Sequence, residues 1–300
     1  MKPIRWALGP MQIVAPGLTE RVVERLFFTP RRTRPSSELR KFVATGHRFE
    51  LSVAGRRVVG WRWGQGPVVY LVHGWGSRGG RLAAFAPPLL EAGHSVVTFD
   101  APGHGMSGRG MSSMPEFARA LASVVERQGP AHAVIAHSLG CAATTLAVAR
   151  GLSVSRLVFL APPANPAAWV TGFARALALQ PRIVEGMQRR SEERLHFRWA
   201  ELDVPTLARE LDVPLLIAHD ADDRVVPWRD GAAVAAAWPG ATMVTTRGLG
   251  HSGVVREPDV VRQAVAFVCG PGSDASWVDE STRLEHELFC RESRWVRATH

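Results

Sequence analysis

The sequence contains few cysteines and no closely spaced cysteine pair. Its 300 residues include only Cys141, Cys269 and Cys290. An odd and sparse set of this kind excludes a disulfide framework as the support of so large a chain, and the absence of a C-x-x-C pair excludes a zinc ribbon. So little cysteine is typical of a reducing compartment, and we expect a cytoplasmic protein.

Lysine is nearly absent. Lys2 and Lys41 are the only two, so arginine supplies almost all of the 36 basic residues and of the net charge of +9. A basic excess can favour nucleic acid, an anionic membrane or an acidic substrate. The arginines are scattered, and no aromatic-basic segment of the RNP type appears, so we expect no nucleic-acid partner. The densest cluster, Arg31, Arg32 and Arg34, is the first candidate for an anion site.

We expect neither a leader sequence nor a membrane span. Gly9 and Pro10 interrupt the apolar start, so we expect no signal peptide. The longest uncharged stretch, 129–149, has the length of a membrane helix. It contains Pro130 and Gly140 and divides into a strand, a turn and a helix, so we expect no transmembrane segment. Peripheral membrane contact through an N-terminal helix and the arginine cluster stays an alternative.

Short apolar strands alternate with amphipathic helices over most of the chain. A hairpin at 48–53 and 58–63, joined through Ala54 and Gly55, comes first. The predicted strands that follow are 68–72, 95–99, 133–136, 156–160, 214–218 and 242–245. The predicted helices between and after them are 82–92, 115–127, 139–150, 230–238 and 258–268. This alternation predicts an α/β fold with a mostly parallel central sheet flanked by helices.

The pattern divides the chain into four parts. Residues 1–45 form an N-terminal helical extension, with one amphipathic helix predicted at 18–28. The core comprises 46–160 and 212–269. Between them, 161–211 show no strand signal and predict a small helical cap, with helices at 169–179, 183–197 and 204–211. A cap inserted after a sheet strand excludes water from a substrate pocket. Residues 270–300 form a polar tail, with a partial helix at 282–294.

The most informative motif is Ala136-His137-Ser138-Leu139-Gly140. It follows an apolar strand and opens an apolar helix, which is the context of a nucleophile elbow. In an elbow the serine lies on a sharp, strained turn, and small residues two positions away on each side prevent clashes. Ala136 stands where glycine is commoner. The alternative is an ordinary turn in which Ser138 caps the helix.

A serine nucleophile needs a base and an acid that orients the base. Gly248-Leu249-Gly250-His251 follows the last predicted strand, so His251 is the candidate base, although a loop histidine can also be a plain surface residue. The loop after the strand 214–218 offers three aspartates as the acid. Asp220 fits an Asx turn best. Asp222 and Asp223 both stay open as the orienting acid.

An oxyanion hole needs two backbone N–H groups. We expect one from Leu139, directly after the nucleophile, and one from Trp75 in the loop His73-Gly74-Trp75-Gly76. His73 is interpreted as a structural hydrogen-bonding residue. Cys141 lies inside the helix after the elbow, so we expect it to be buried packing.

Five segments together resemble the α/β-hydrolase superfamily, and among its members the bacterial serine esterases with a short helical lid. These segments are HGWG at 73–76, FDAPGHG at 99–105, AHSLG at 136–140, DDRVVP at 222–227 and GLGH at 248–251. The resemblance implies Ser138, Asp223 and His251 in that order, because the orienting acid in such sequences falls four residues before the proline at 227. Asp222 is the second candidate. Haloalkane dehalogenases and epoxide hydrolases carry aspartate at the nucleophile position, so Ser138 argues against them.

The expected activity is hydrolysis of small-molecule carboxylic esters through an acyl-enzyme, which requires no cofactor and no metal. Thioesterase, C–C bond hydrolase and acyltransferase activities use the same residues and remain alternatives, as does a catalytically silent binding protein. The sequence contains no signal for an oligomeric state. Apolar side chains in the predicted cap either line an acyl pocket or form the cap's own core: Trp169, Phe173, Leu177, Phe197 and Trp199.

Overall fold

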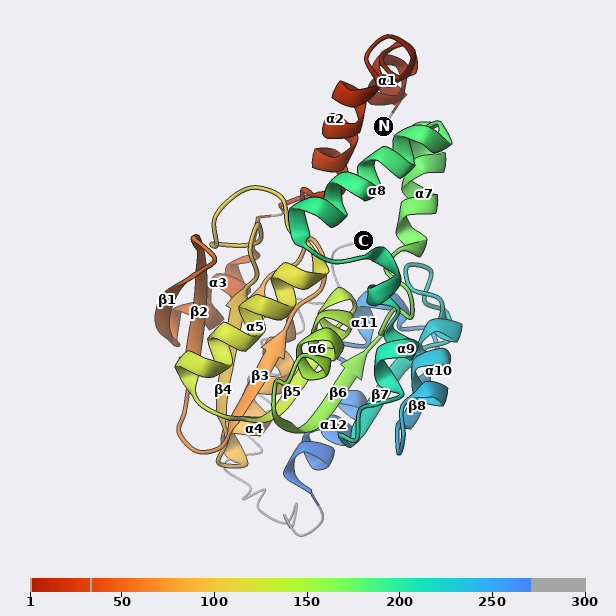
Figure 1. The fold of residues 1–300 in the computed structure, drawn as a ribbon. Helices are drawn as coiled ribbons and strands as arrows, with labels where there is room; N and C mark the ends of the chain where they lie inside the picture. The colour runs from red at the N-terminus through yellow and green to blue at the C-terminus, as the bar shows by residue number, and fades with distance from the viewer. Residues whose placement is uncertain (1, 33, 271–300) are drawn as a thin grey trace.

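The computed structural model describes residues 2–32 and 34–270, and its centre is one eight-stranded sheet (Figure 1). The strand order is β1-β2-β4-β3-β5-β6-β7-β8. The strands are β1 (His47–Val53), β2 (Arg56–Trp63), β3 (Val68–Val72), β4 (Ser95–Asp100), β5 (Ala131–His137), β6 (Val154–Leu160), β7 (Leu215–Asp220) and β8 (Thr242–Thr246). β2 is antiparallel to both β1 and β4, and every other neighbouring pair is parallel. The predicted fold class is confirmed.

Consecutive residues of the central strands point into two separate apolar cores, as the pleat of a strand requires. In β3, Tyr70 and Val72 belong to one core, whereas Leu71 belongs to the other. The first core is covered by α5 (Met114–Gln128), α6 (Leu139–Ala149), α9 (Val204–Ala208) and α10 (Trp228–Ala237). The second is covered by the 3-10 helix η1 (Gly79–Phe85), α4 (Ala86–Glu91) and α12 (Pro258–Cys269). Burial on both faces explains the continuous apolar runs of these strands.

The helix predicted at 82–92 is wrong as a single element. The structure has η1 followed by α4, with non-helical backbone angles at Leu82. Pro87 and Pro88 carry no N–H for a hydrogen bond to the preceding turn, but they fit the first turn of a new helix. The chain therefore ends one helical element and begins another at Ala86.

The prediction of one helix in the N-terminal extension is also wrong, because three are present. They are α1 (Lys2–Val14), α2 (Pro16–Phe28) and α3 (Ser37–Ala44). Gly9 and Pro10 disfavour α1 by propensity. Tertiary contacts compensate: the buried Gln12 side chain accepts a hydrogen bond from Gln180 N (2.7 Å) and donates one to Ala178 O (3.3 Å).

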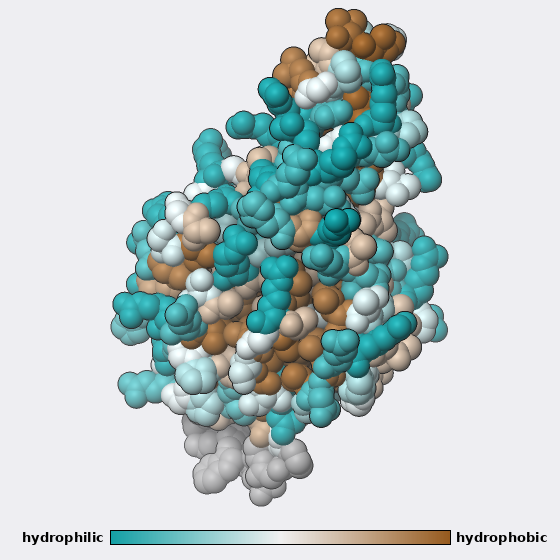
Figure 2. All heavy atoms as spheres, viewed as in Figure 1, coloured by the Kyte–Doolittle hydropathy of each residue, from teal (hydrophilic) through white to brown (hydrophobic). Residues whose placement is uncertain are grey.

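Four helices stand together beyond the carboxyl ends of the parallel strands (Figure 1). We call them the helical layer: α1, α2, α7 (Ala168–Leu177) and α8 (Pro181–Leu195). Phe27 of α2 packs edge-on against Phe173 of α7 at 5.1 Å between ring centroids. The buried Glu24 of α2 accepts a hydrogen bond from Arg194 of α8 at 2.7 Å. Segments more than 140 residues apart thus share one interior. Hydrophilic atoms cover much of the outside of this layer (Figure 2).

The apolar side chains expected in the insertion contribute to this shared interior. Leu177, Phe197 and Trp199 are buried, and Trp169 and Phe173 pack against the same core. Trp199, in the short 3-10 helix η2 (Trp199–Leu202), lies 6.1 Å from the ring of Phe28. These contacts show the residues packing as the core of the helical layer.

Two further sequence predictions concern the C-terminal tail and the absence of a membrane span. The helix predicted at 282–294, with Cys290, lies outside the described residues. Among the helices described, none has both the length and the apolar character needed to cross a membrane.

Candidate active site

Ser138 lies on a sharp turn between β5 and α6. Its backbone angles are φ 54° and ψ −124°, a region that non-glycine residues rarely adopt. Backbone hydrogen bonds hold the turn on both sides: Ser138 N donates to Leu160 O, and Cys141 N donates to Ser138 O, each at 2.9 Å. The expected strand–turn–helix geometry is therefore present, with strain at the residue predicted to react.

Two glycines allow the neighbouring backbone to approach this turn. A Cβ on Gly140 would lie 2.7 Å from the carbonyl oxygens of Val72 and His73, and one on Gly74 would lie 2.9 Å from Ser138 Cβ. Both distances are shorter than real Cβ contacts, so only glycine fits at these positions. The loop after β3 consequently lies directly against Ser138.

Three loops at the carboxyl ends of parallel strands bring the predicted residues together. Ser138 follows β5, Asp223 follows β7, and His251 follows β8 in the short helix α11 (Gly250–Gly253). His251 Nε2 lies 3.1 Å from Ser138 Oγ, and His251 Nδ1 lies 2.7 Å from Asp223 Oδ2. The exposed Asp222 instead accepts a hydrogen bond from Gly248 N at 3.0 Å. Of the two open candidates, Asp223 is thus the aspartate in contact with His251.

Asp223 is buried and remains ionised. Burial alone would raise its pKa, but hydrogen bonding with His219 and His251 and from the amides of Val225 and Val226 outweighs burial and lowers the pKa. Its Oδ2 lies 3.5 Å from His219 Nε2. A fixed anion at this position favours the His251 tautomer that carries its proton on Nδ1.

Asp220 has a larger role than the Asx turn expected of it. The turn bond is present, with Asp222 N donating to Asp220 Oδ1 at 3.0 Å. The same fully buried carboxylate also accepts hydrogen bonds from Gly250 N, Leu249 N and Thr246 Oγ1. Burial acts to raise its pKa, but these hydrogen bonds lower it. Asp220 therefore joins β7 to the loop that carries His251, which a local sequence pattern does not indicate.

His137, whose role sequence reasoning missed, supports His251 from the other side. Its Nε2–H donates to His251 O at 3.0 Å, and the two rings lie 4.6 Å apart. Burial lowers the pKa of His137 to about 3, so the ring is neutral. Its position beside Ser138 was the available signal, but residue type alone does not predict this partner.

The two N–H groups expected to bind an oxyanion belong to two segments that meet at the Ser138 turn. Leu139 is the first residue of α6, so its N–H has no intrahelical acceptor. Trp75 follows Gly74 in the loop packed against Ser138. Among the described residues, neither N–H donates to a partner. Both N–H groups therefore stay candidate oxyanion donors.

The loop that carries Trp75 is held by two buried histidines. His73 Nδ1–H donates to Gly74 O at 2.7 Å and its Nε2 accepts from Ala101 N at 3.0 Å, which fits the structural role expected of it. His104 Nε2 accepts from Gly76 N at 3.0 Å. Burial lowers the pKa of His73 to about 4 and that of His104 to about 3. Neutral rings therefore fix this loop without adding charge.

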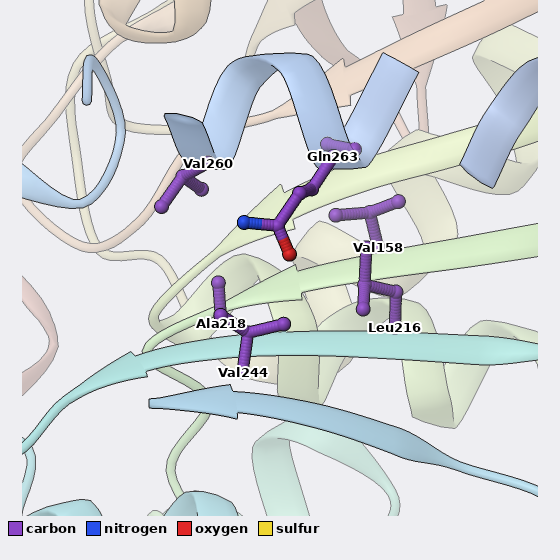
Figure 3. Close-up of a pocket in the computed structure, with 7 residues that line it drawn as sticks. Val158, Leu216, Ala218, Val244, Val260 and Gln263 are labelled. Carbon is purple, nitrogen blue, oxygen red and sulfur yellow. The ribbon is translucent and has the colours of Figure 1, made fainter. Parts of the chain in front are cut away.

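A groove of about 380 Å³ opens beside His251. Its lining is formed by Asp222, Arg224, Val225 and Gly248 to His251. A second hollow lies between α12 and strands β6 to β8, where Val158, Leu216 and Val244 surround it (Figure 3). It has no room for a water molecule, so we interpret it as a packing gap. The groove beside His251 borders the predicted site at its histidine.

No group of three histidine, cysteine, aspartate or glutamate side chains within 2–32 and 34–270 could hold a metal ion.

Cys141 is fully buried, and burial raises the pKa of its thiol, in agreement with the packing role expected of it. Ser138 is therefore the nucleophile candidate that has a base within hydrogen-bonding distance.

Solved structures that share this fold belong to proteins with different named activities. A bromoperoxidase from Bacillus anthracis is 18% identical with a TM-score of 0.60, covering 74% of this chain and 99% of that one. An esterase from Exiguobacterium antarcticum is 16% identical with a TM-score of 0.58, covering 74% and 99%. A meta-cleavage product hydrolase from Pseudomonas fluorescens is 17% identical with a TM-score of 0.54, covering 73% and 96%. The structural similarity shows the fold, and at such low identities the reaction stays open.

Comparison with curated proteins finds no match to this sequence. The model of the alpha/beta hydrolase family, in contrast, matches residues 69–264, which include Ser138, Asp223 and His251. That match covers most of the chain and agrees with the sheet order, the strained turn and the structural neighbours. The chain belongs to the α/β-hydrolase family.

Proposed function

We propose that the protein is a serine hydrolase that cleaves carboxylic esters through an acyl-enzyme intermediate. The observation that carries this proposal is the continuous hydrogen-bonded series from Asp223 through His251 to Ser138 at a strained turn. Its geometry matches the requirement that nucleophile, base and orienting acid lie within hydrogen-bond reach of one another.

In the proposed reaction, His251 Nε2 accepts the hydroxyl proton while Ser138 Oγ attacks the acyl carbonyl. Asp223 holds the His251 ring in the required tautomer and stabilises the imidazolium that forms. The N–H groups of Trp75 and Leu139 bind the oxyanion of the tetrahedral intermediate. His251 then donates its proton to the departing alcohol, and the acyl group remains on Ser138.

In the second half of the reaction, His251 acts as the base again. Water takes the place of the alcohol, His251 accepts its proton, and the resulting hydroxide attacks the acyl carbonyl. Collapse of the intermediate releases the acid and restores Ser138. In this proposal the helical insertion, 161–211, acts as a cap that limits the access of bulk water. No step calls for a metal or an organic cofactor.

The test is hydrolysis of p-nitrophenyl esters of increasing acyl length by the full chain and by Ser138→Ala. We expect turnover by the native chain and a loss of about 10⁴-fold or more in the variant, because the attacking oxygen is gone. Ser155→Ala replaces an exposed serine on β6 and should keep full activity. Equal turnover by Ser138→Ala and the native chain would contradict the assignment of the nucleophile.

The remaining alternatives predict different results in the same experiment. A thioesterase or acyltransferase would favour thioesters or a second alcohol, and would still lose activity in Ser138→Ala. A silent binding protein would hydrolyse none of these substrates. It would also fail to react with a fluorophosphonate probe at Ser138, whereas an enzyme with an unsuitable substrate would still be labelled.

A further inference from the structure

Helix α1 exposes a row of large apolar side chains. The exposed fractions are 83% for Trp6, 69% for Ile13 and 83% for Val14, and Leu18 at the start of α2 is 53% exposed. Trp6 and Ile13 are seven residues apart and lie one above the other on the helix. Val14 points about 100° further round, still on the side away from the buried Leu8 and Gln12. In Figure 2 the hydrophobic colour gathers at the tip of the molecule, where Figure 1 labels α1. Large apolar patches of this kind mark interaction surfaces.

The opposite side of α1 is firmly attached, so the exposed side is held outward. Leu8 is 2% exposed and Gln12 is 3% exposed. Besides the hydrogen bonds that Gln12 makes to the turn between α7 and α8, its carbonyl accepts one from Arg182 at 2.7 Å. A helix that is apolar all round is normally covered on all sides. Here the described residues cover only one side of α1.

The charge around this surface is positive, although α2 also carries the half-buried Glu20. Residues 1–19 contain Lys2 and Arg5 and no acidic residue. Arg5 is exposed on α1, and Arg21 and Arg25 are exposed on α2. A second copy of this chain would bring like charges together. An apolar face with a tryptophan and a basic surround instead suits the interface of an anionic lipid bilayer, where tryptophan is enriched and each basic side chain is attracted to the surface.

We propose that Trp6, Ile13, Val14 and Leu18 insert into the surface of anionic membranes, and that this contact holds the helical layer against the lipid. The inference does not depend on the proposed esterase activity. It also locates the membrane contact on α1 and the first turn of α2, away from the end of α2 and from the arginine cluster, where other structure makes contact. Phe28 of α2 is buried against Trp199, and the Arg32 guanidinium donates to Gly105 O.

The test is co-sedimentation of the full chain with vesicles of equal parts phosphatidylglycerol and phosphatidylcholine, and with vesicles of phosphatidylcholine alone. We expect binding to the anionic vesicles that weakens with added salt. Trp6→Ser, Ile13→Ser and Val14→Ser combined should reduce the partition coefficient by about tenfold or more, because three inserted apolar groups are removed. Arg5→Gln should weaken binding to the anionic vesicles and leave binding to the phosphatidylcholine vesicles unchanged.

Met106→Ser is the matched control, since Met106 is 48% exposed and lies outside the helical layer. It should bind as the native chain does, and all variants should keep the native thermal midpoint because the replaced side chains are exposed. Absence of binding by the native chain, or equal binding by the triple variant, would overturn the proposal. A dimer that dissociates in the triple variant, without vesicle binding, would assign the surface to a second copy instead.

Discussion

Ser138 lies at the carboxyl edge of the sheet, and the helical layer stands beyond that edge. Different kinds of contact stabilise the two regions. At this edge, Ser138 directly follows β5, and Asp223 and His251 lie a few residues after the ends of β7 and β8. Backbone hydrogen bonds such as Ser138 N to Leu160 O fix the turn. In the helical layer, side chains join segments that are far apart in sequence, for example Phe27 to Phe173. Local sequence therefore specifies the site closely, whereas its covering depends on long-range packing.

The two regions also use charge differently. Asp220 and Asp223 at the sheet edge are buried acceptors for backbone N–H groups and histidines. Glu24 in the helical layer is buried between Arg190 and Arg194, at 3.4 and 2.7 Å. The aspartates position one ring for chemistry, and the glutamate joins two helices. Four substitutions would sharpen this comparison.

Asp223→Asn should have the largest effect. The amide can present its N–H to His251, which favours the wrong tautomer, so we expect kcat to fall about 10³- to 10⁴-fold. Asp222→Asn is the matched control, because in the described part of the chain that exposed carboxylate accepts from Gly248 N and not from His251. It should retain activity within about twofold. Steady-state kinetics on an ester substrate measures both, and equal losses in the two variants would contradict the assignment.

Phe28→Ala should weaken the helical layer and leave the sheet intact. Phe28 is 5% exposed, and its ring contacts Phe27 at 5.0 Å and the Arg194 guanidinium at 5.0 Å. Removing a buried phenylalanine costs about 3 kcal/mol or more. We expect faster amide hydrogen exchange in α2 and α8 with unchanged protection in β5.

Leu26→Ala provides the control on the same helix, because Leu26 is 38% exposed. Its exchange pattern should match the native protein. If protection in β5 fell together with that of α8 in Phe28→Ala, the helical layer and the sheet would form one cooperative unit, and the comparison above would fail.

Asp220→Asn should lower the free energy of unfolding by about 2 kcal/mol at neutral pH, because the amide replaces one of two oxygens that accept hydrogen bonds. The pKa of Asp220 is lowered in the folded state. Its contribution is therefore present above the unfolded value of about 3.9 and is lost as the pH falls through the folded value.

The difference in unfolding free energy between native and Asp220→Asn should consequently shrink on acidification from pH 5 downward. Urea unfolding at several pH values measures it. A difference that stays constant over this range would show that the ionised carboxylate is not the group that stabilises the His251 loop.

Ala54→Gly should have the smallest effect and should be stabilising. Ala54 and Gly55 form the two-residue turn between β1 and β2, with φ values of 49° and 74°. An alanine in the left-handed region is strained, so glycine should raise the free energy of unfolding by about 0.5–1 kcal/mol. Gly55→Ala should do the reverse. Thermal unfolding of both variants tests the pair.

Sequence reasoning reached most of the site because the motifs are local. The elbow around Ser138 and the glycine-rich loop before His251 each follow a strand whose apolar run is recognisable. The choice of Asp223 over Asp222 came from a family resemblance, and the contact with His251 supports it. The Asx turn at Asp220 was expected, but its contacts with the His251 loop and the role of His137 were missed, because these hydrogen-bond partners lie 29 and 114 residues away.

The sequence by itself determined the α/β class. It also determined the order in which the loops with Ser138, Asp223 and His251 follow the parallel strands, since strand and helix periodicities are properties of neighbouring residues. Only the tertiary structure decided that α1 forms despite Gly9 and Pro10, and that α1 and α2 join α7 and α8 in one layer. Propensity acts over a few residues, whereas the burial that stabilises α1 is supplied by a turn more than 160 residues further along the chain.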